Sequence, residues 1–128
     1  MDFVAGRSAV NFACGGGVRY FVRKIPEFAA LGCCVAAWPP AGLRHYGFED
    51  GRNIAVCPEP ANFGEVARGL LPRKAIREAL GRAARDLVLD KHTVGVRSAH
   101  LITWLRELSR GRVVRGVFHE GEFQFTPA

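Results

Sequence analysis

The stretch that decides the fold is RKIPEFAALGCCVAAWPPAGL, residues 23–43. Its apolar residues at 25, 28 and 29 continue a helical spacing that begins at Val18. Residues 33–37 then form an apolar run that is too short for a helix and is closed by two prolines soon after it. Such a run is typical of a strand buried in a parallel sheet. The stretch therefore predicts a helix, a buried strand and a loop, in that order.

Two further apolar runs predict strands of the same sheet. Residues 9–14 form the first run, which ends at three glycines, and residues 53–57 form the other. Helical spacing fills residues 18–29, between the first two strands. Pro26 stands inside that segment and cannot occupy a regular helix interior. Either the helix bends at Pro26 or its regular part starts there.

The second half of the chain is predicted to be mostly helical. Apolar stripes at helical spacing occupy residues 62–71, 76–88 and 93–108. Asn62 and Glu65 have the spacing of a capping box, and Thr93 is a candidate N-cap. Five apolar residues of the last helix are expected to face inward: Val94, Leu101, Ile102, Leu105 and Leu108.

The predicted fold class is α/β, because parallel neighbouring strands need crossover connections such as these helices. We expect a half-Rossmann arrangement of two or three layers, with about three parallel strands followed by C-terminal helices. The expected organisation is one domain over residues 1–110 and a tail over residues 111–128. A partial sheet leaves an open edge, so we expect the tail to add an antiparallel strand, or a homodimer or partner protein to complete the sheet.

The tail itself predicts a β-hairpin. Val113-Val114 and Val117-Phe118 precede a candidate turn at Glu120-Gly121, and Phe123 and Phe125 then alternate with polar residues. A flexible tail is the alternative.

Composition and charge describe one globular domain. The 128 residues are 48% hydrophobic and 23% charged, with a net charge of +6. Between residues 68 and 115, twelve Lys and Arg stand against four Asp and Glu, a net charge of +8. Such a segment can attract phosphates, nucleic acid or an anionic membrane surface. Because the cations are spread through amphipathic helices without interleaved aromatic side chains, we favour a solvated surface, and nucleic acid is the less favoured partner.

No apolar run is long enough to span a bilayer, and the start Met-Asp-Phe-Val lacks the features of a secretory signal, so we expect a cytoplasmic protein. No nucleophile or metal motif links the histidines, and His45 could approach a ligand only if its loop folds over a site. We expect no cofactor, no metal and no assignable general base. The cysteines lack metal-binding spacing and are predicted to be reduced core residues: Cys14, Cys33, Cys34 and Cys57.

Four segments, in order and at matching spacing, resemble one glycosyltransferase family: residues 26–33, 42–43, 49–53 and 90–93. Over about residues 9–108 the chain resembles the C-terminal, donor-binding lobe of group 1 glycosyltransferases of the GT-B type. Its order of elements is similar to the spore-maturation-protein-like branch. The resemblance implies a partial Rossmann-like lobe that binds a nucleotide or nucleotide sugar. Sugar transfer is not expected of this chain alone, because it needs an acceptor lobe and groups that align two substrates.

The resemblance also implies a nucleotide site around Glu27. In such enzymes an acid at the start of this helix accepts hydrogen bonds from ribose hydroxyls. A first-turn acid that is simply favoured by the helix dipole is the alternative. The family often carries a second acid eight positions earlier, and Arg19 stands there, which counts against retaining transferase chemistry. Gly42 and Leu43 match a family segment near the nucleotide, with an ordinary loop as the alternative.

A phosphate role is predicted for the glycines that follow the first strand, because backbone N–H groups at a strand-to-helix turn can cradle an anion. A flexible turn is the alternative. Arg19, Arg23 and Lys24 are candidates to face the diphosphate. The complete set of candidate nucleotide-binding residues is Gly15, Gly16, Gly17, Arg19, Arg23, Glu27, Gly42 and Leu43.

A second functional hypothesis belongs to another class. The chain would then be a small interaction module that kept the fold without the ligand. It would use its open sheet edge for protein contacts, or its basic helices for protein or nucleic-acid contacts.

Overall fold

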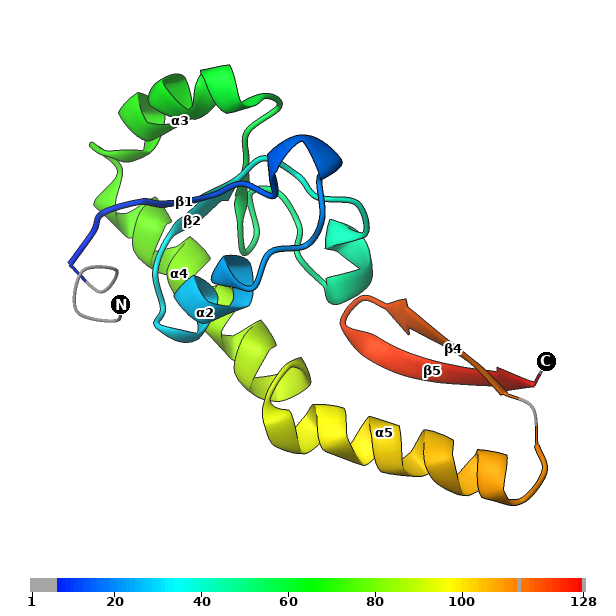
Figure 1. The fold of residues 1–128 in the computed structure, drawn as a ribbon. Helices are drawn as coiled ribbons and strands as arrows, with labels where there is room; N and C mark the ends of the chain where they lie inside the picture. Colours follow the sequence, from blue (N-terminus) through cyan, green and yellow to red (C-terminus); the bar gives the residue numbers. More distant parts are fainter. Residues whose placement is uncertain (1–6, 113, 128) are drawn as a thin grey trace.

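The computed structural model describes residues 7–112 and 114–127, and it confirms the α/β fold class (Figure 1). The predicted hairpin residue Val113 and the first six residues of the chain lie outside this described part. Three strands form one parallel sheet in the order β1 (Asn11–Ala13), β2 (Val35–Ala37), β3 (Ala55–Val56). The α-helices are α2 (Lys24–Ala30), α3 (Phe63–Leu70), α4 (Lys74–Lys91) and α5 (Val94–Ser109), and the 3-10 helices are η1 (Gly16–Val18), η2 (Leu43–Tyr46) and η3 (Pro60–Asn62).

Helices cover both faces of the parallel sheet. Val35 and Ala37 of β2 pack in a core cluster with residues of α2 and α4, including Ile25 and Ala84. Ala36, between them, belongs to a second cluster, against which Phe63, Val66 and Leu70 of α3 pack. This alternation follows from the pleat of a strand, whose successive side chains point to opposite faces. The arrangement is therefore three layers, with α2 and α4 on one side and α3 on the other.

The structure resolves the two readings of Pro26. Helix α2 begins at Lys24 and has Pro26 in its first turn. A proline is tolerated there because the first N–H groups of a helix have no partner within the helix. The regular helix therefore starts just before Pro26, and the apolar residues from Val18 to Val22 precede it.

Helix α4 packs directly on the turn between α2 and β2. Gly81 is buried in α4, and a Cβ atom at this position would overlap the carbonyl oxygen of Gly32. Gly32 itself has a φ of +73°, in the left-handed region that favours glycine. The close approach of these two glycines allows α4 to pack against the same face of the sheet as α2.

Two expectations about the C-terminal helices need correction. Asn62 lies in η3 and makes no side-chain capping hydrogen bond to α3, so the predicted capping box does not form. The cap at Thr93 is confirmed, since its Oγ1 accepts a hydrogen bond from Val96 N at 3.4 Å. However, the expected inward-facing residues of α5 are exposed, from 40% at Leu108 to 83% at Val94. The physical reason is that α5 extends away from the parallel sheet and meets the C-terminal hairpin on another side (Figure 1).

The predicted hairpin is confirmed, with β4 (Val114–His119) paired antiparallel to β5 (Glu122–Pro127). Glu120 and Gly121 both have positive φ, +50° and +84°, as in a type I′ turn. In the described part of the chain the hairpin is a separate sheet, so the expectation that the tail adds a strand to the parallel sheet is wrong. Its turn docks on η2 and α4 instead: Gly121 N donates to the His45 carbonyl at 2.8 Å, and Lys91 pairs with Glu122 at 2.6 Å.

His92, just after α4, ties η2 to the helical half. Its Nε2 lies 2.7 Å from the Tyr46 carbonyl oxygen, and its Nδ1 contacts Arg97. The Arg97 guanidinium carbon lies 4.1 Å from the ring centre of Phe118 in β4. An arginine can only donate, so His92 accepts at Nδ1 and donates from Nε2, which is the neutral ring. Burial, and to a lesser degree the charge of Arg97, lower the pKa of His92.

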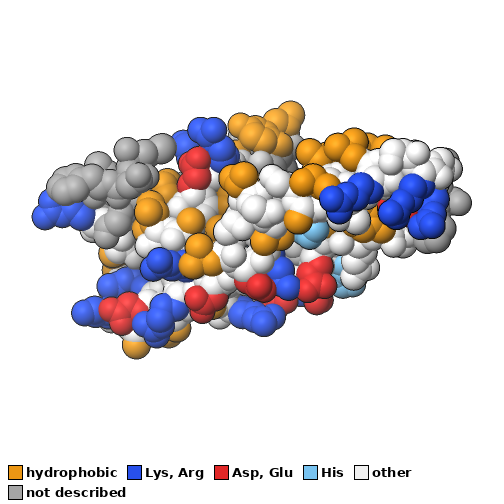
Figure 2. Space-filling model, turned by 90° about the horizontal axis from the view of Figure 1, so that it is seen from below, with side chains coloured by type: hydrophobic (Ala, Val, Ile, Leu, Met, Phe, Trp, Pro, Cys, Tyr) orange, Lys and Arg blue, Asp and Glu red, His pale blue; other side chains and the backbone are white. Residues whose placement is uncertain are grey.

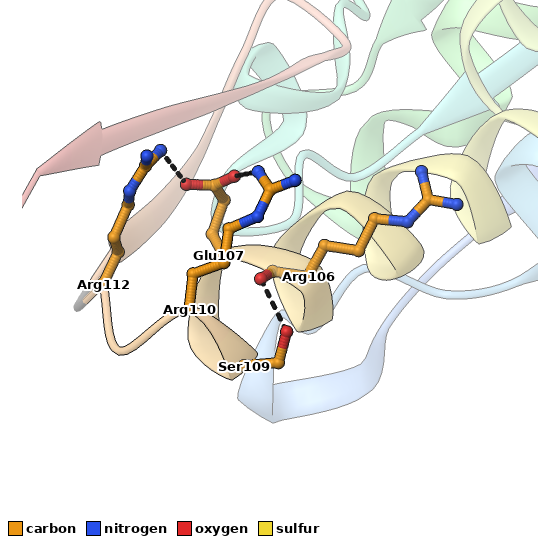
Figure 3. A network of polar contacts seen from close by, with 5 residues as sticks. All are labelled: Arg106, Glu107, Ser109, Arg110 and Arg112. Carbon is orange, nitrogen blue, oxygen red and sulfur yellow. Dashed lines mark hydrogen bonds and ion pairs between the residues drawn. The ribbon is translucent and has the colours of Figure 1, made fainter.

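A small ionic network lies at the C-terminal end of α5 (Figure 3). The Glu107 carboxylate binds Arg110 at 2.9 Å and Arg112 at 2.7 Å. These hydrogen bonds, that of Arg112 first, lower the pKa of Glu107. The network ties the last turn of α5 to the segment that enters β4.

None of the four cysteines forms a disulfide, but they do not share one environment. Cys33, Cys34 and Cys57 are buried, whereas Cys14 is exposed, which corrects its prediction as a core residue. Among the described helices, none has both the length and the apolar character needed to cross a membrane.

We predict that Gly81→Ala lowers the free energy of unfolding by about 1–3 kcal/mol, because the added methyl group would overlap the Gly32 carbonyl. An alanine in place of a helical glycine otherwise stabilises by up to about 1 kcal/mol. Gly69→Ala in α3 is the matched control, since nothing lies within 4 Å of its Cβ position. Urea unfolding followed by circular dichroism measures both. A stabilised Gly81→Ala variant would contradict this packing.

We also predict that the protein loses stability as the pH falls below about 6.5, the ordinary pKa of histidine. The folded state keeps the pKa of His92 low while the unfolded chain binds a proton. The stability is therefore complete above that ordinary value and decreases as the pH falls towards the lowered pKa. Urea unfolding from about pH 7.5 to 5 should show a smaller pH dependence in His92→Gln than in the wild type. Equal slopes in His92→Gln and the wild type would refute the explanation.

Candidate functional site

The candidate site lies at the edge of the parallel sheet where all three strands end. Because β1, β2 and β3 are parallel, the chain leaves each of them at this same edge. Residues 14–23 follow β1, residues 38–49 follow β2 and residues 57–62 follow β3. In open α/β sheets, ligands bind in the crevice outside the carboxyl ends of the strands. The topology therefore brings the predicted site residues to the edge at which binding is expected.

Side chains join the three segments at this edge. Arg19 donates from Nε and Nη2 to the Pro39 carbonyl, at 3.2 and 2.9 Å, and its guanidinium carbon lies 5.3 Å from the ring centre of Trp38. Trp38 Nε1 in turn donates to the Pro58 carbonyl at 3.1 Å. The segment after β1 is thus bound to the segment after β2, and that segment to the one after β3.

A pocket of about 460 Å³ opens between η2, its flanking residues and the end of β3. Gly42 enters η2 with a φ of +79°, and Leu43 is a buried core residue with 7% exposure. The pocket combines apolar walls with charged groups on short loops. Its lining residues are Pro39, Pro40, Gly42, Leu43, Arg44, His45, Phe48, Glu49, Asp50 and Val56.

A buried asparagine shapes the acidic side of the pocket. Asn53 is 4% exposed, its Oδ1 accepts from Glu49 N at 2.8 Å, and its Nδ2 donates to the Gly47 carbonyl at 3.0 Å. These bonds fold residues 47–53 into a fixed loop. Asp50 Oδ1 accepts from Val56 N at 2.8 Å, and Glu49 Oε1 lies 3.2 Å from Arg52 Nη1. Both carboxylates are therefore oriented by the loop itself.

Arg44 differs from the other charged groups of the pocket. Its side chain is exposed and has no ion-pair partner among the residues that the structure describes. A guanidinium presents five N–H donors in a planar fork that matches a phosphate. Arg44 is therefore the residue of this pocket that is available to an anionic ligand.

The three predicted glycines lie after β1, and they do not line the pocket at η2. At Gly15 a Cβ atom would overlap the Tyr20 carbonyl oxygen, so backbone packing alone explains this glycine. Gly16 and Gly17 have open space around them, and Gly16 has a φ of +65°. Arg19 does not line the pocket either, but it donates hydrogen bonds to the carbonyl of Pro39, which does. Of the eight predicted residues, Gly42 and Leu43 line the pocket.

Glu27 lies in the first turn of α2, and Arg23 is the residue just before this helix. Arg23 Nε is 2.8 Å from Glu27 Oε1, and the two side chains are 89% and 42% exposed. The carboxylate is thus accessible and held on one side by a cation. An acid in the first helical turn also interacts favourably with the helix dipole.

Sequence reasoning assigned no role to Pro39, Pro40, Arg44, Glu49 or Asp50, and it made the role of His45 depend on its loop. The available signal was position, since these residues follow β2 at its carboxyl end. What the sequence did not reveal is the turn closed by Asn53, which brings Glu49 and Asp50 back to η2.

The pocket has groups that can bind a ligand, and none of its lining residues is a Ser, Thr, Cys or Lys. Burial, with a contribution from Asp50, raises the pKa of the nearby Cys57 to about 11, so its thiol stays protonated at neutral pH. In the described part of the chain, no three His, Cys, Asp or Glu side chains are grouped to hold a metal. Figure 2 shows one face of the molecule, on which Lys and Arg side chains are spread with Asp and Glu among them.

Comparison with known proteins gives one family match. A family model described as Glycosyl transferase-like matches residues 10–103, a segment that contains the whole parallel sheet and helices α2, α3 and α4 and ends inside α5. No curated protein and no solved structure gives a significant match. Because the matched segment covers well over half of the 128 residues, the chain belongs to the Glycosyl transferase-like family.

Proposed function

We propose that this chain is part of the donor-binding lobe of a GT-B glycosyltransferase, of the spore-maturation-protein-like branch, and that it binds a nucleotide or nucleotide sugar. The observation that carries the proposal is the pocket at the carboxyl ends of the parallel strands, inside the segment that matches the family. A parallel α/β sheet with its ligand at this edge is the general pattern of nucleotide binding in such folds.

The chemistry of the pocket supports an anionic, hydroxyl-bearing ligand. Arg44 offers a fork of donors to a diphosphate, while the Glu49 carboxylate offers acceptors to hydroxyl groups. Glu27 is proposed to accept hydrogen bonds from the ribose. Its oxygen beyond the Arg23 contact is available for them, because the side chain is 42% exposed.

Binding, rather than transfer, is the proposed activity of this chain by itself. Sugar transfer requires a bound acceptor and groups that stabilise the developing charge between the two substrates. Residues 1–110 are proposed as the binding domain and residues 111–128 as an appended tail.

We predict saturable binding of one class of nucleoside diphosphate. Uniformly ¹⁵N-labelled protein would be titrated with UDP, GDP and ADP, and amide shifts would be followed by NMR. The amide shifts should concentrate at Gly42, Leu43 and Glu49. The nucleotide that produces them identifies the preferred base. Arg44→Ala should weaken binding about tenfold, because it removes a charge-assisted hydrogen bond to phosphate.

Arg82→Ala is the matched control, since Arg82 is an exposed cation on α4 that does not line the pocket. Glu27→Gln tests the ribose contact separately: it should weaken nucleotide binding about tenfold and leave binding of inorganic pyrophosphate unchanged. Shifts that avoid η2, or an equal effect of Arg82→Ala and Arg44→Ala, would refute the proposed pocket. No shift with any nucleotide at millimolar concentration would refute nucleotide binding.

A further inference from the structure

One face of helix α5 is left uncovered by the rest of the described chain. Its residues recur at intervals of four, three, four and three, which is the spacing of the seam between two paired helices. None of them is charged, and the apolar ones are exposed by 40% at Leu108 to 83% at Val94. We call this set the α5 stripe: Val94, Ser98, Leu101, Leu105 and Leu108. The hairpin packs on another side of α5, at Arg97 and His100.

The helix that carries the stripe is already held in place by the fold. Thr93 caps its N-terminus, and the Glu107 carboxylate binds two arginines at its C-terminal end. On its inner side, the ring centre of His100 lies 5.6 Å from that of Phe123. A free peptide of this length would be only marginally helical in water. Because the fold has already ordered α5, a second helix can pair with it without that ordering cost.

A small cavity opens beside the stripe at Leu101. Its volume is about 180 Å³, and four of its six lining residues are Leu, Trp or Phe. The full set is Arg97, His100, Leu101, Trp104, Phe118 and Phe123. An apolar cavity of about 150 Å³ holds a benzene-sized group, so this cavity can accept one apolar side chain from outside. Large side chains that enter such pockets contribute most of the binding energy of protein interfaces.

The stripe is complementary to a second copy of itself. Consider two copies of α5 that lie antiparallel, with a two-fold axis beside residue 103. Leu101 then meets Leu105 of the partner subunit, and the small Ser98 meets Leu108 of the partner subunit. Such a pairing is self-complementary, as a two-fold interface requires. It also sets the two helix dipoles in opposite directions, and it removes no charged group of the stripe from water.

We propose that the protein forms a two-fold symmetric dimer through the α5 stripe, in which Leu105 of the partner subunit enters the cavity beside Leu101. This surface is not the open edge of the parallel sheet, and the inference does not rest on nucleotide binding. Helix α5 has 16 residues and is about 24 Å long and about 10 Å across. Its footprint is therefore well below the ~800 Å² per partner of a standard stable interface. We expect a dissociation constant in the micromolar range.

Sedimentation velocity of the full chain, from micromolar to millimolar concentration, tests the dimer. The average mass should rise with concentration from 14.0 kDa towards twice that value. Leu105→Asp should weaken the dimer about a hundredfold, because each dimer would bury two unpaired carboxylates. Leu89→Asp is the matched control: Leu89 is 50% exposed near the C-terminal end of α4, against 51% for Leu105, and it lies outside the stripe. Its association should match that of the wild type.

Ser98→Leu provides a gain in affinity that a folding defect cannot imitate. The added side chain would pack on Leu108 of the partner subunit and should tighten the dimer about tenfold. A monomer at every concentration would refute the proposal, and so would an assembly of three or four chains. Equal effects of Leu105→Asp and Leu89→Asp would refute this surface. A monomer that co-sediments with anionic lipid vesicles, and fails to do so as Leu105→Asp, would assign the stripe to a lipid surface and refute the dimer.

Discussion

The position of η2 depends on the hydrogen bond between His92 Nε2 and the Tyr46 carbonyl, and the functional edge of the molecule depends on η2. Leu43 anchors one end of η2 in the core, and the bond from His92 holds the other end against the helical half. The proposed nucleotide pocket is lined by Arg44 and His45, which lie between those anchors. The hairpin turn also docks on η2, through the backbone of His45 and Tyr46. A shift of η2 would therefore alter both the pocket and the position of the hairpin.

Local sequence patterns predict an element of the fold well where a pattern is compatible with only one structure. The run 33–37, closed by prolines, has few alternatives to a buried strand, and the structure has β2 there. The hairpin was predicted from alternation around Glu120-Gly121, whose turn residues take the expected positive φ values. Helix α5 shows what such patterns cannot predict. Its apolar stripe was visible in the sequence, but periodicity reveals a face without revealing what covers it. In the described chain the stripe is exposed, because the hairpin meets α5 on a different side.

The sequence predicts the edge of the sheet at which the candidate site lies. It predicts the residues that line the site less well. Strand ends and crossover helices indicate which loops converge, so residues 15–19 and 42–43 were sought in the right segments. Which of them line a pocket depends on contacts between loops. Gly15 is explained by packing against Tyr20, whereas Glu49 and Asp50 reach η2 only because Asn53 closes their turn. The closure of this turn depends on one buried side-chain amide, and no periodic pattern in the sequence indicates it.

The geometry of the C-terminal segment explains how the hairpin reaches the site without disturbing it. Helix α5 has 16 residues and spans about 24 Å at 1.5 Å per residue. A six-residue strand spans about 20 Å, so β4 returns the chain nearly to the level at which α5 began. That level is where η2 lies. Contacts between the hairpin tip and η2 involve backbone atoms of His45, Tyr46 and Gly47, which leaves the side chains of η2 free to line the pocket. An appended segment of this kind can change the groups beside a binding pocket while leaving the pocket's own loops intact. The residues of the nucleotide pocket lie inside the family match, whereas the hairpin lies outside it.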